Sequence, residues 1–159
     1  MLGRELVIST DAVAAELRNE HWKEVTRPYS ETIAVSGESG GDLSGTIYVR
    51  ALGGLLITST ICNSQIYRRS QRHAQQSGLD CYALHMIETG SMRGNLGQQN
   101  VAAKPGDILI ADLARPFEIQ VDAGRRRSVF VGRDELAKHL SGLNLHGSVL
   151  RSDWSMTGL

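Results

Sequence analysis

The stretch KPGDILIADLARPFEI, residues 104–119, is the most informative part of the sequence for the fold. A Pro-Gly pair marks a tight turn, and an apolar run follows it. Asp112 interrupts this run, and Arg115-Pro116 closes it. The pattern predicts a wall strand, a corner, and a second strand that begins at Phe117. Asp112 then has three interpretations: a catalytic carboxylate, a group facing a pocket, or a polar group near the strand end that anchors Arg115 or another arginine.

Short runs of the same kind recur from Ile33 to Val131, separated by glycine, asparagine and serine. Many short strands at this spacing favour a β-sandwich or barrel over repeated βαβ units. We expect a mainly β fold with strands near residues 33–36, 43–51, 54–62, 64–70, 81–88, 91–94, 99–103, 107–112, 117–121 and 127–132.

Helical patterns flank these strands. Residues 9–26 predict a first helix that ends before Arg27-Pro28, because proline disfavours a helical conformation in the residue before it. A second helix is expected from Arg133 to about Leu143, capped by Asp134, and a further helix near Asp153. The sequence predicts a single domain over 1–159: a helical entry (1–30), a barrel (31–132) and a helical segment (133–159) that we expect to continue beyond Leu159.

Composition limits the classes of function. The 17 basic and 17 acidic residues cancel, which argues against nucleic-acid binding through a positive surplus. Arg68-Arg69 with Arg72, and the run 125–127, are interpreted as solvated turns. Cys62 and Cys81 form no CxxC pair, so we expect free thiols. Without a signal peptide or a long apolar stretch, the sequence indicates a cytoplasmic protein with no membrane partner.

The histidines do not have the spacing of a metal site. Paired ligands on a strand need a His-x-His pattern, because alternate residues face the same side, and none of the five histidines provides it. His85 and Glu88 are three apart and so face opposite sides of a strand. We expect no metal and no cofactor. A metal-free dyad of His85 with Asp112 stays open as a general base and its orienting group.

Read together, the segments resemble a known family, the N-terminal effector-binding and dimerisation domain of AraC/XylS-type bacterial transcription regulators, in its AraC-binding-like branch. The resemblance rests on STDAVAAELRNEHWKEV (9–25), GDLSGTIYVRALGGLLITSTICNSQIYRRS (41–70), DCYALHMIETGSMRGNLGQQNVAAKPGDILIADLARPFEI (80–119) and VFVGRDELAKHLSGLNLHGSVL (129–150). Branch members often begin the last helix with Pro-Arg, where this chain has Gly132-Arg133.

The resemblance implies a cupin-like double-stranded β-helix, or jelly-roll barrel, that binds a small effector and is not an enzyme. It also implies a homodimer formed by the helices after the barrel, and DNA binding only through a helix-turn-helix module beyond Leu159. The candidate dimer residues in 133–143 are Leu136, His139, Leu140 and Leu143.

Five residues are candidates for effector binding. Trp22 is a candidate lid, Arg69 belongs to the branch-like IYRRS run, and Tyr82, His85 and Asp112 are polar groups on strands. An arginine suits a carboxylate-bearing effector, although Arg69 has the alternative of pairing with Asp112 or Glu88. Two other functions stay open: a metal-independent isomerase that uses His85, and a barrel that only dimerises.

Overall fold

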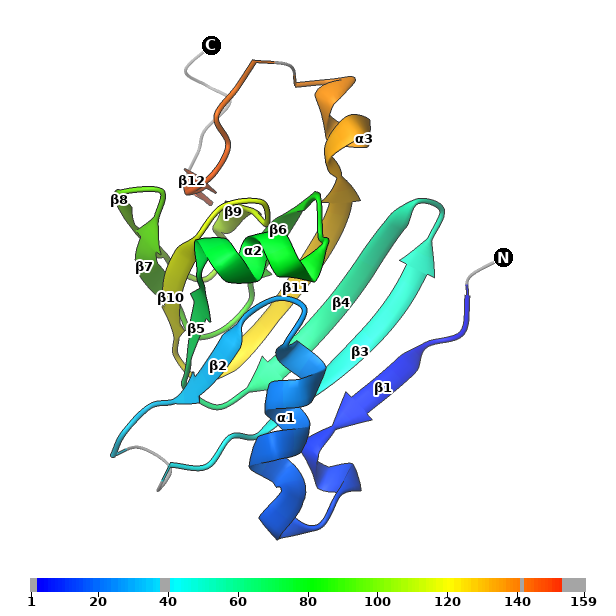
Figure 1. Ribbon diagram of the computed structural model, residues 1–159, viewed down its shortest axis with the longest axis vertical. Coiled ribbons are helices and arrows are strands. Elements are labelled where there is room, and N and C mark those ends of the chain that lie inside the picture. The colour runs from blue at the N-terminus through cyan, green and yellow to red at the C-terminus, as the bar shows by residue number, and fades with distance from the viewer. Residues whose placement is uncertain (1–2, 38–40, 141, 153–159) are drawn as a thin grey trace.

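Residues 104–119 connect the two antiparallel sheets of the computed structural model, which describes residues 3–37, 41–140 and 142–152 (Figure 1). The first half forms β9 (Ile108–Asp112) in a seven-stranded sheet, and the second half forms β10 (Phe117–Val121) in a five-stranded sheet. Arg115-Pro116 lies between them, where the chain crosses from one sheet to the other. The predicted wall strand, corner and second strand are confirmed.

The two sheets form the cupin-like barrel, and all ten expected strands are present. The larger sheet has the order β1 (Leu6–Ser9), β3 (Gly45–Leu52), β4 (Leu55–Cys62), β11 (Gly124–Gly132), β6 (Cys81–Ile87), β9 and β12 (Ser148–Leu150). The smaller sheet has the order β2 (Glu31–Ala34), β5 (Gln65–Arg69), β10, β7 (Met92–Leu96) and β8 (Gln99–Ala103). The prediction of a mainly β fold is confirmed.

The core fills the space between the sheets. Because strand residues alternate between faces, β10 buries Phe117, Ile119 and Val121 and exposes Glu118. The facing strand β9 buries Leu109 and Ala111 completely. Full burial of a side chain as large as Leu109 or Ile119 stabilises the fold by roughly 1.5–3 kcal/mol relative to its exposure. The apolar residues that alternate along residues 104–119 therefore contribute buried side chains to the core from both sheets.

The N-terminal segment differs from the prediction. Residues 6–9 pair with β3, with Leu6 opposite Val49, so a strand stands where the expected helix was to begin. Short 3-10 turns follow at Thr10–Ala12 and Ala15–Leu17, and α1 spans only Arg18–Thr26. Ser9 does act as a cap, but of the first 3-10 turn. The expected helix over 9–26 is thus wrong in its first half: the ladder with β3 ends at Ser9, and residues 10–17 form two short 3-10 turns in place of an α-helix.

The C-terminal segment is less helical than expected. Helix α3 spans Arg133–Ala137 and does not reach Leu143, because the Leu136 carbonyl accepts the N–H groups of both His139 and Leu140 and closes the last turn. Residues 148–150 form the edge strand β12. The helix expected near Asp153 lies outside the described residues.

Helix α2 (Gln71–Ser77) is absent from the sequence-based expectation. Its sequence has no apolar stripe, and only Ala74 is buried. Its signals are a cap at each end: the Ser70 hydroxyl accepts the His73 N–H, and Gly78 adopts the left-handed conformation that ends many helices.

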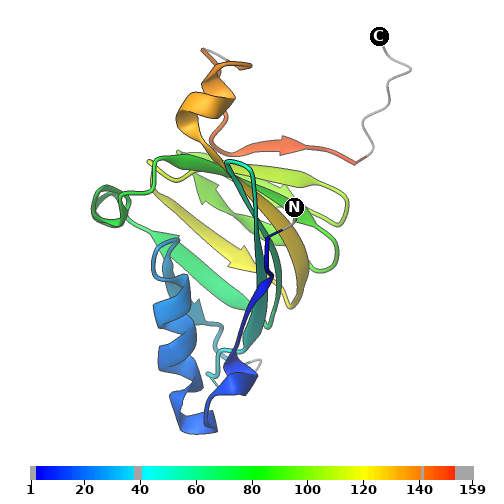
Figure 2. The same ribbon diagram turned by 90° about the vertical axis from the view of Figure 1, so that its right-hand side faces the viewer.

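Helices α1 and α3 lie at opposite ends of the molecule in both views (Figure 1 and Figure 2). Within the described ranges, no helix combines the length and apolar character needed to cross a membrane.

Candidate functional site

An internal cavity of about 290 Å³, partly open to solvent, lies between the sheets. Its wall consists mainly of inward-facing side chains of β3, β4, β6 and β11, and β1 and the segment around the end of α1 complete it. None of the lining residues is acidic. They are Ile8, Val25, Thr26, Pro28, Tyr29, Ile47, Val49, Leu56, Thr58, Thr60, Tyr67, Leu79, Cys81, His85, Arg126, Ser128 and Phe130.

Tyr29 reaches into this cavity from the connection between α1 and β2. Its ring centroid lies 5.7 Å from Tyr67, 5.6 Å from His85 and 5.2 Å from Phe117. A hydrogen bond of 2.9 Å joins its hydroxyl to His85 Nε2. Burial raises the pKa of Tyr29, so the phenol stays neutral. The segment after α1 thereby supplies part of the cavity wall.

His85 is held at both ring nitrogens. In addition to Tyr29, Nδ1 lies 2.7 Å from Ser128 Oγ. Burial, followed by the positive charge of Arg126, lowers the pKa of His85 to about 3. The imidazole is therefore neutral near pH 7 and a weak general base, with one nitrogen donating a hydrogen bond and the other accepting one.

Arg126 is the cationic group of the cavity. Its Nη2 donates to the Tyr67 hydroxyl at 2.9 Å, its Nη1 lies 3.6 Å from Cys62 Sγ, and its Cζ lies 5.1 Å from the Tyr67 ring centroid. No carboxylate within residues 3–37, 41–140 and 142–152 forms an ion pair with it. The cavity thus holds a positive charge that no carboxylate of the described residues neutralises through an ion pair.

Hydrogen bonds connect Arg126 to α1. The Tyr67 hydroxyl donates to Gln65 Oε1 at 3.0 Å, and Trp22 Nε1 donates to the same oxygen at 2.9 Å. Trp22 is fully buried, and a Cβ atom at Gly45 would lie only 2.4 Å from its ring. Trp22 therefore packs in the core beside the cavity and is not among the residues that line it, in contrast to the lid position expected from the sequence.

Arg69 is also placed away from the cavity wall, and its guanidinium binds backbone. Its Nε donates to the Leu113 carbonyl at 2.8 Å, and its Nη1 donates to the carbonyls of Pro28 and Tyr29 at 2.9 and 2.8 Å. Its Nη2 donates to the Ser77 hydroxyl at 2.6 Å. Burial lowers its pKa from the ordinary arginine value. The alternative of an ion pair with Asp112 or Glu88 is not realised.

Asp112 and Tyr82 meet on the outer face of the larger sheet, where they are opposite each other in the ladder. Asp112 forms an ion pair with Arg133 and accepts the Ala114 N–H at 3.0 Å, while Arg133 Nη1 donates to the Tyr82 hydroxyl at 2.8 Å. His85 is three residues from Tyr82 and so faces the cavity instead. The dyad of His85 with Asp112 is therefore wrong, and Asp112 anchors the arginine that begins α3.

The sequence-based interpretation missed Arg126 and Tyr29. The run 125–127 was interpreted as a solvated turn, but it lies in β11, where neighbouring residues face opposite sides. Arg127 points outward and pairs with Glu88 at 2.6 Å, whereas Arg126 points inward. Strand alternation counted back from Ser128 and Phe130 is the signal that identifies Arg126. Tyr29 lies outside any strand, and no pattern marks it.

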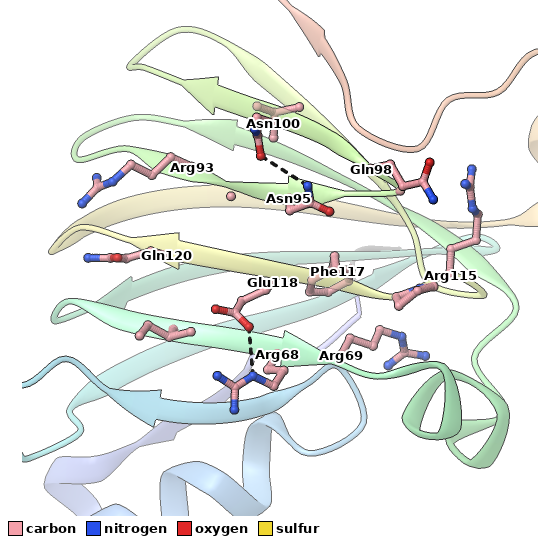
Figure 3. A pocket seen from close by; sticks show the side chains of 15 residues that line it. Arg68, Arg69, Arg93, Asn95, Gln98, Asn100, Arg115, Phe117, Glu118 and Gln120 are labelled. Carbon is pink, nitrogen blue, oxygen red and sulfur yellow. Dashed lines mark hydrogen bonds and ion pairs between the residues drawn. The ribbon is translucent and has the colours of Figure 1, made fainter.

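A larger and more open pocket of about 1020 Å³ lies on the outer face of the smaller sheet (Figure 3). The arginines of this surface already have ion-pair or hydrogen-bond partners. Arg68 pairs with Glu118 at 2.9 Å, Arg93 pairs with Asp122 at 3.0 Å, and Arg115 donates to Asn144 at 2.8 Å. On this surface Arg68 and Arg93 pair with carboxylates and Arg115 donates to an amide oxygen, whereas the wall of the internal cavity is mostly apolar and holds one arginine without an ion pair among the described residues. The internal cavity is the stronger candidate for a binding site.

Among the described residues, no group of three or more histidine, cysteine, aspartate or glutamate side chains is arranged to hold a metal ion. Cys62 and Cys81 are free thiols, as expected.

The family model of the AraC-binding-like domain matches residues 24–150. The chain belongs to this family. The match covers the whole barrel from the end of α1 to β12, including every strand that contributes to the cavity except β1. No curated protein sequence matches this AraC-binding-like domain significantly.

Solved structures agree with the fold of the AraC-binding-like domain. The AraC-like transcriptional activator CuxR is similar with a TM-score of 0.81 and 20% identity, over 93% of this chain and 55% of that chain. This chain therefore spans about half the length of that activator. The EutQ protein of Clostridium difficile is more distant, with a TM-score of 0.44, 11% identity, and coverage of 60% of this chain and 73% of that one.

We predict that Arg69→Leu lowers the free energy of unfolding by about 3 kcal/mol or more, because the buried carbonyl of Leu113 and the partly buried carbonyls of Pro28 and Tyr29 lose their donor. Arg68→Leu is the matched control, since the exposed ion pair that it removes contributes roughly 0–1 kcal/mol. Urea denaturation of both variants measures the difference. Equal losses would show that Arg69 does not hold these segments together.

We predict that His85 makes stability depend on pH. Its pKa is about 3 in the folded protein and near 6.5 when unfolded, so the unfolded state binds the extra proton as the pH falls from 6.5. Stability then decreases by up to about 1.4 kcal/mol per pH unit between pH 6.5 and 3. Comparison of wild type with His85→Gln isolates this slope, and His21→Gln, on α1 and outside the cavity lining, controls for the substitution itself. Parallel profiles for wild type and His85→Gln would contradict it.

Proposed function

We propose that this domain binds a small effector in its internal cavity and is the sensing domain of a cytoplasmic, AraC-type transcription regulator. The observation that carries the proposal is the cavity itself: an apolar chamber of about 290 Å³ with a few inward polar groups, at the lower end of the volumes of small-molecule sites. The family match and the similar fold of an AraC-like activator support it. In this proposal, DNA is contacted by a helix-turn-helix module outside residues 1–159.

Transmission of the signal is proposed to run through α1. An effector changes a regulator only by binding two arrangements with different affinity. A ligand that contacts Arg126 affects the hydrogen bonds that run through Tyr67 and Gln65 to Trp22 on α1. A ligand that contacts Tyr29 affects the segment after α1, whose backbone Arg69 binds. Both connections make the position of α1 sensitive to what occupies the cavity.

We favour a binding site over an active site. Both ring nitrogens of His85 already have partners, and its low pKa makes it a weak base, which is unfavourable for an isomerase that uses this residue.

We predict that screening of small aromatic and aliphatic compounds yields ligands that stabilise the protein without being turned over. At 100 times Kd a ligand adds about 2.7 kcal/mol, which raises Tm by about 5 °C or more for a domain of this size. In a Trp154→Phe background, Trp22 is the only tryptophan, and its emission should change on binding.

Two matched variants locate that binding. Thr58→Phe fills the cavity and should abolish the shift in Tm, whereas Ser59→Phe, on the outward face of the same strand, should preserve it. Turnover of a ligand would favour the isomerase. Indifference to every compound would favour a barrel that only dimerises.

Homodimerisation is proposed for the segment around α3. Leu140 and Leu143 are 43% and 59% exposed, which is unusual for large apolar side chains so close together. We predict that Leu136→Glu with Leu140→Glu converts a dimer to a monomer in sedimentation velocity, while Lys138→Glu at a polar exposed position does not. Unchanged sedimentation of the double variant would refute this interface.

A further inference from the structure

Arg126 has an incomplete set of hydrogen-bond partners. A guanidinium offers five N–H donors, and the described residues accept from Arg126 only at the Tyr67 hydroxyl and at Cys62 Sγ, a weak acceptor. By comparison, the guanidinium of Arg69 donates hydrogen bonds to three carbonyls and a hydroxyl. The remaining donors of Arg126 are available to a molecule in the cavity.

The surroundings of Arg126 do not compensate its charge. The polar groups that share the cavity with it are neutral hydroxyls and the neutral imidazole of His85. Its charge acts across the cavity, since it lowers the pKa of His85 and opposes the effect of burial on the pKa of Tyr29. Arg126 is partly exposed, and covering its charge with a ligand is costly unless the ligand brings an opposite charge.

We propose that the cavity accepts a compact monocarboxylate with an apolar body, whose carboxylate pairs with the guanidinium of Arg126. This rests on the effector-binding function proposed above and names the class of effector. The planar fork of arginine matches the two oxygens of a carboxylate, and such charge-assisted pairs are among the strongest hydrogen bonds in proteins. Ile47, Val49 and Phe130 provide apolar surface for the rest of the molecule.

The size and charge of the site define the class further. A cavity of about 290 Å³ restricts the ligand to a few rings or a short chain. A single guanidinium neutralises one negative charge, so a monoanion fits better than a phosphate dianion. The sequence suggested that Arg69 would bind the carboxylate of an effector. We assign this role to Arg126 instead, because Arg69 donates its hydrogen bonds mainly to backbone carbonyls.

The test is calorimetric titration of the full 159-residue chain at pH 7 with benzoate and hexanoate, their neutral amides benzamide and hexanamide, and inorganic phosphate. We expect at least one acid to bind about tenfold or more tightly than its amide, because the amide leaves the guanidinium without a counter-charge. Inorganic phosphate should neither bind nor displace the acid.

Substitutions assign the preference to Arg126. Arg126→Gln should reduce the affinity for the acid by about tenfold or more and leave that for the amide nearly unchanged. Arg127→Gln is the matched control, since the neighbouring side chain points outward and pairs with Glu88. If Arg126→Gln does not fold, Arg126→Lys keeps the charge and should retain a reduced preference for the acid, because lysine lacks the planar fork.

The carboxylate assignment is overturned if acids and amides bind equally, if Arg126→Gln has undiminished affinity for the acid, or if phosphate binds in place of the acids. The first two leave effector binding in the cavity intact. If neither acids nor amides bind, the carboxylate assignment fails, and the comparison of Thr58→Phe with Ser59→Phe in the wider ligand screen decides the proposed function separately.

Discussion

The buried guanidinium of Arg69 is the interaction on which the arrangement of this molecule depends. Placing an arginine in a protein interior is unfavourable unless its donors are satisfied, and here backbone carbonyls do so instead of a carboxylate. These carbonyls belong to the segment after α1 and to the corner between β9 and β10. One side chain on β5 thus fixes the N-terminal segment against the crossover between the sheets, and that fixation places the Tyr29 ring inside the barrel.

The two inward arginines of the barrel have opposite consequences. Arg69 donates four hydrogen bonds and acts as a structural tie, whereas Arg126 donates only two, one of them to sulfur, and keeps free donors. Both are connected to the region around α1, the first through the carbonyl of Tyr29 and the second through Tyr67 and Gln65 to Trp22. At the other end of the barrel, Asp112 holds Arg133 at the start of α3. The hydrogen bonds that begin at Arg126 in the cavity therefore lead to α1.

The sequence predicted the strands well and the site poorly, for physical reasons that particular residues show. Alternation along a strand is local, so the strands around residues 104–119 follow from the sequence. Helix ends were less predictable: the long-range ladder of Leu6–Ser9 with β3 ends where the helix was expected to begin, and two short 3-10 turns precede α1. Among the candidate site residues only His85 lies on the cavity wall, because being polar on a strand does not tell which face a side chain occupies until the register is known.

By itself, the sequence determined that this chain forms a mainly β fold, because turn residues and apolar alternation are properties of neighbouring residues, and the resemblance of its segments to the AraC-binding-like domain indicated the barrel. Only the tertiary structure decided the chemistry of its interior. Arg69 and Arg126 are both arginines on strands, and nothing local distinguishes them. The carbonyls that satisfy the first, and the absence of a described carboxylate beside the second, come from segments far apart in the chain that the fold brings together. For the same reason Asp112 became an anchor for Arg133 rather than a partner of His85.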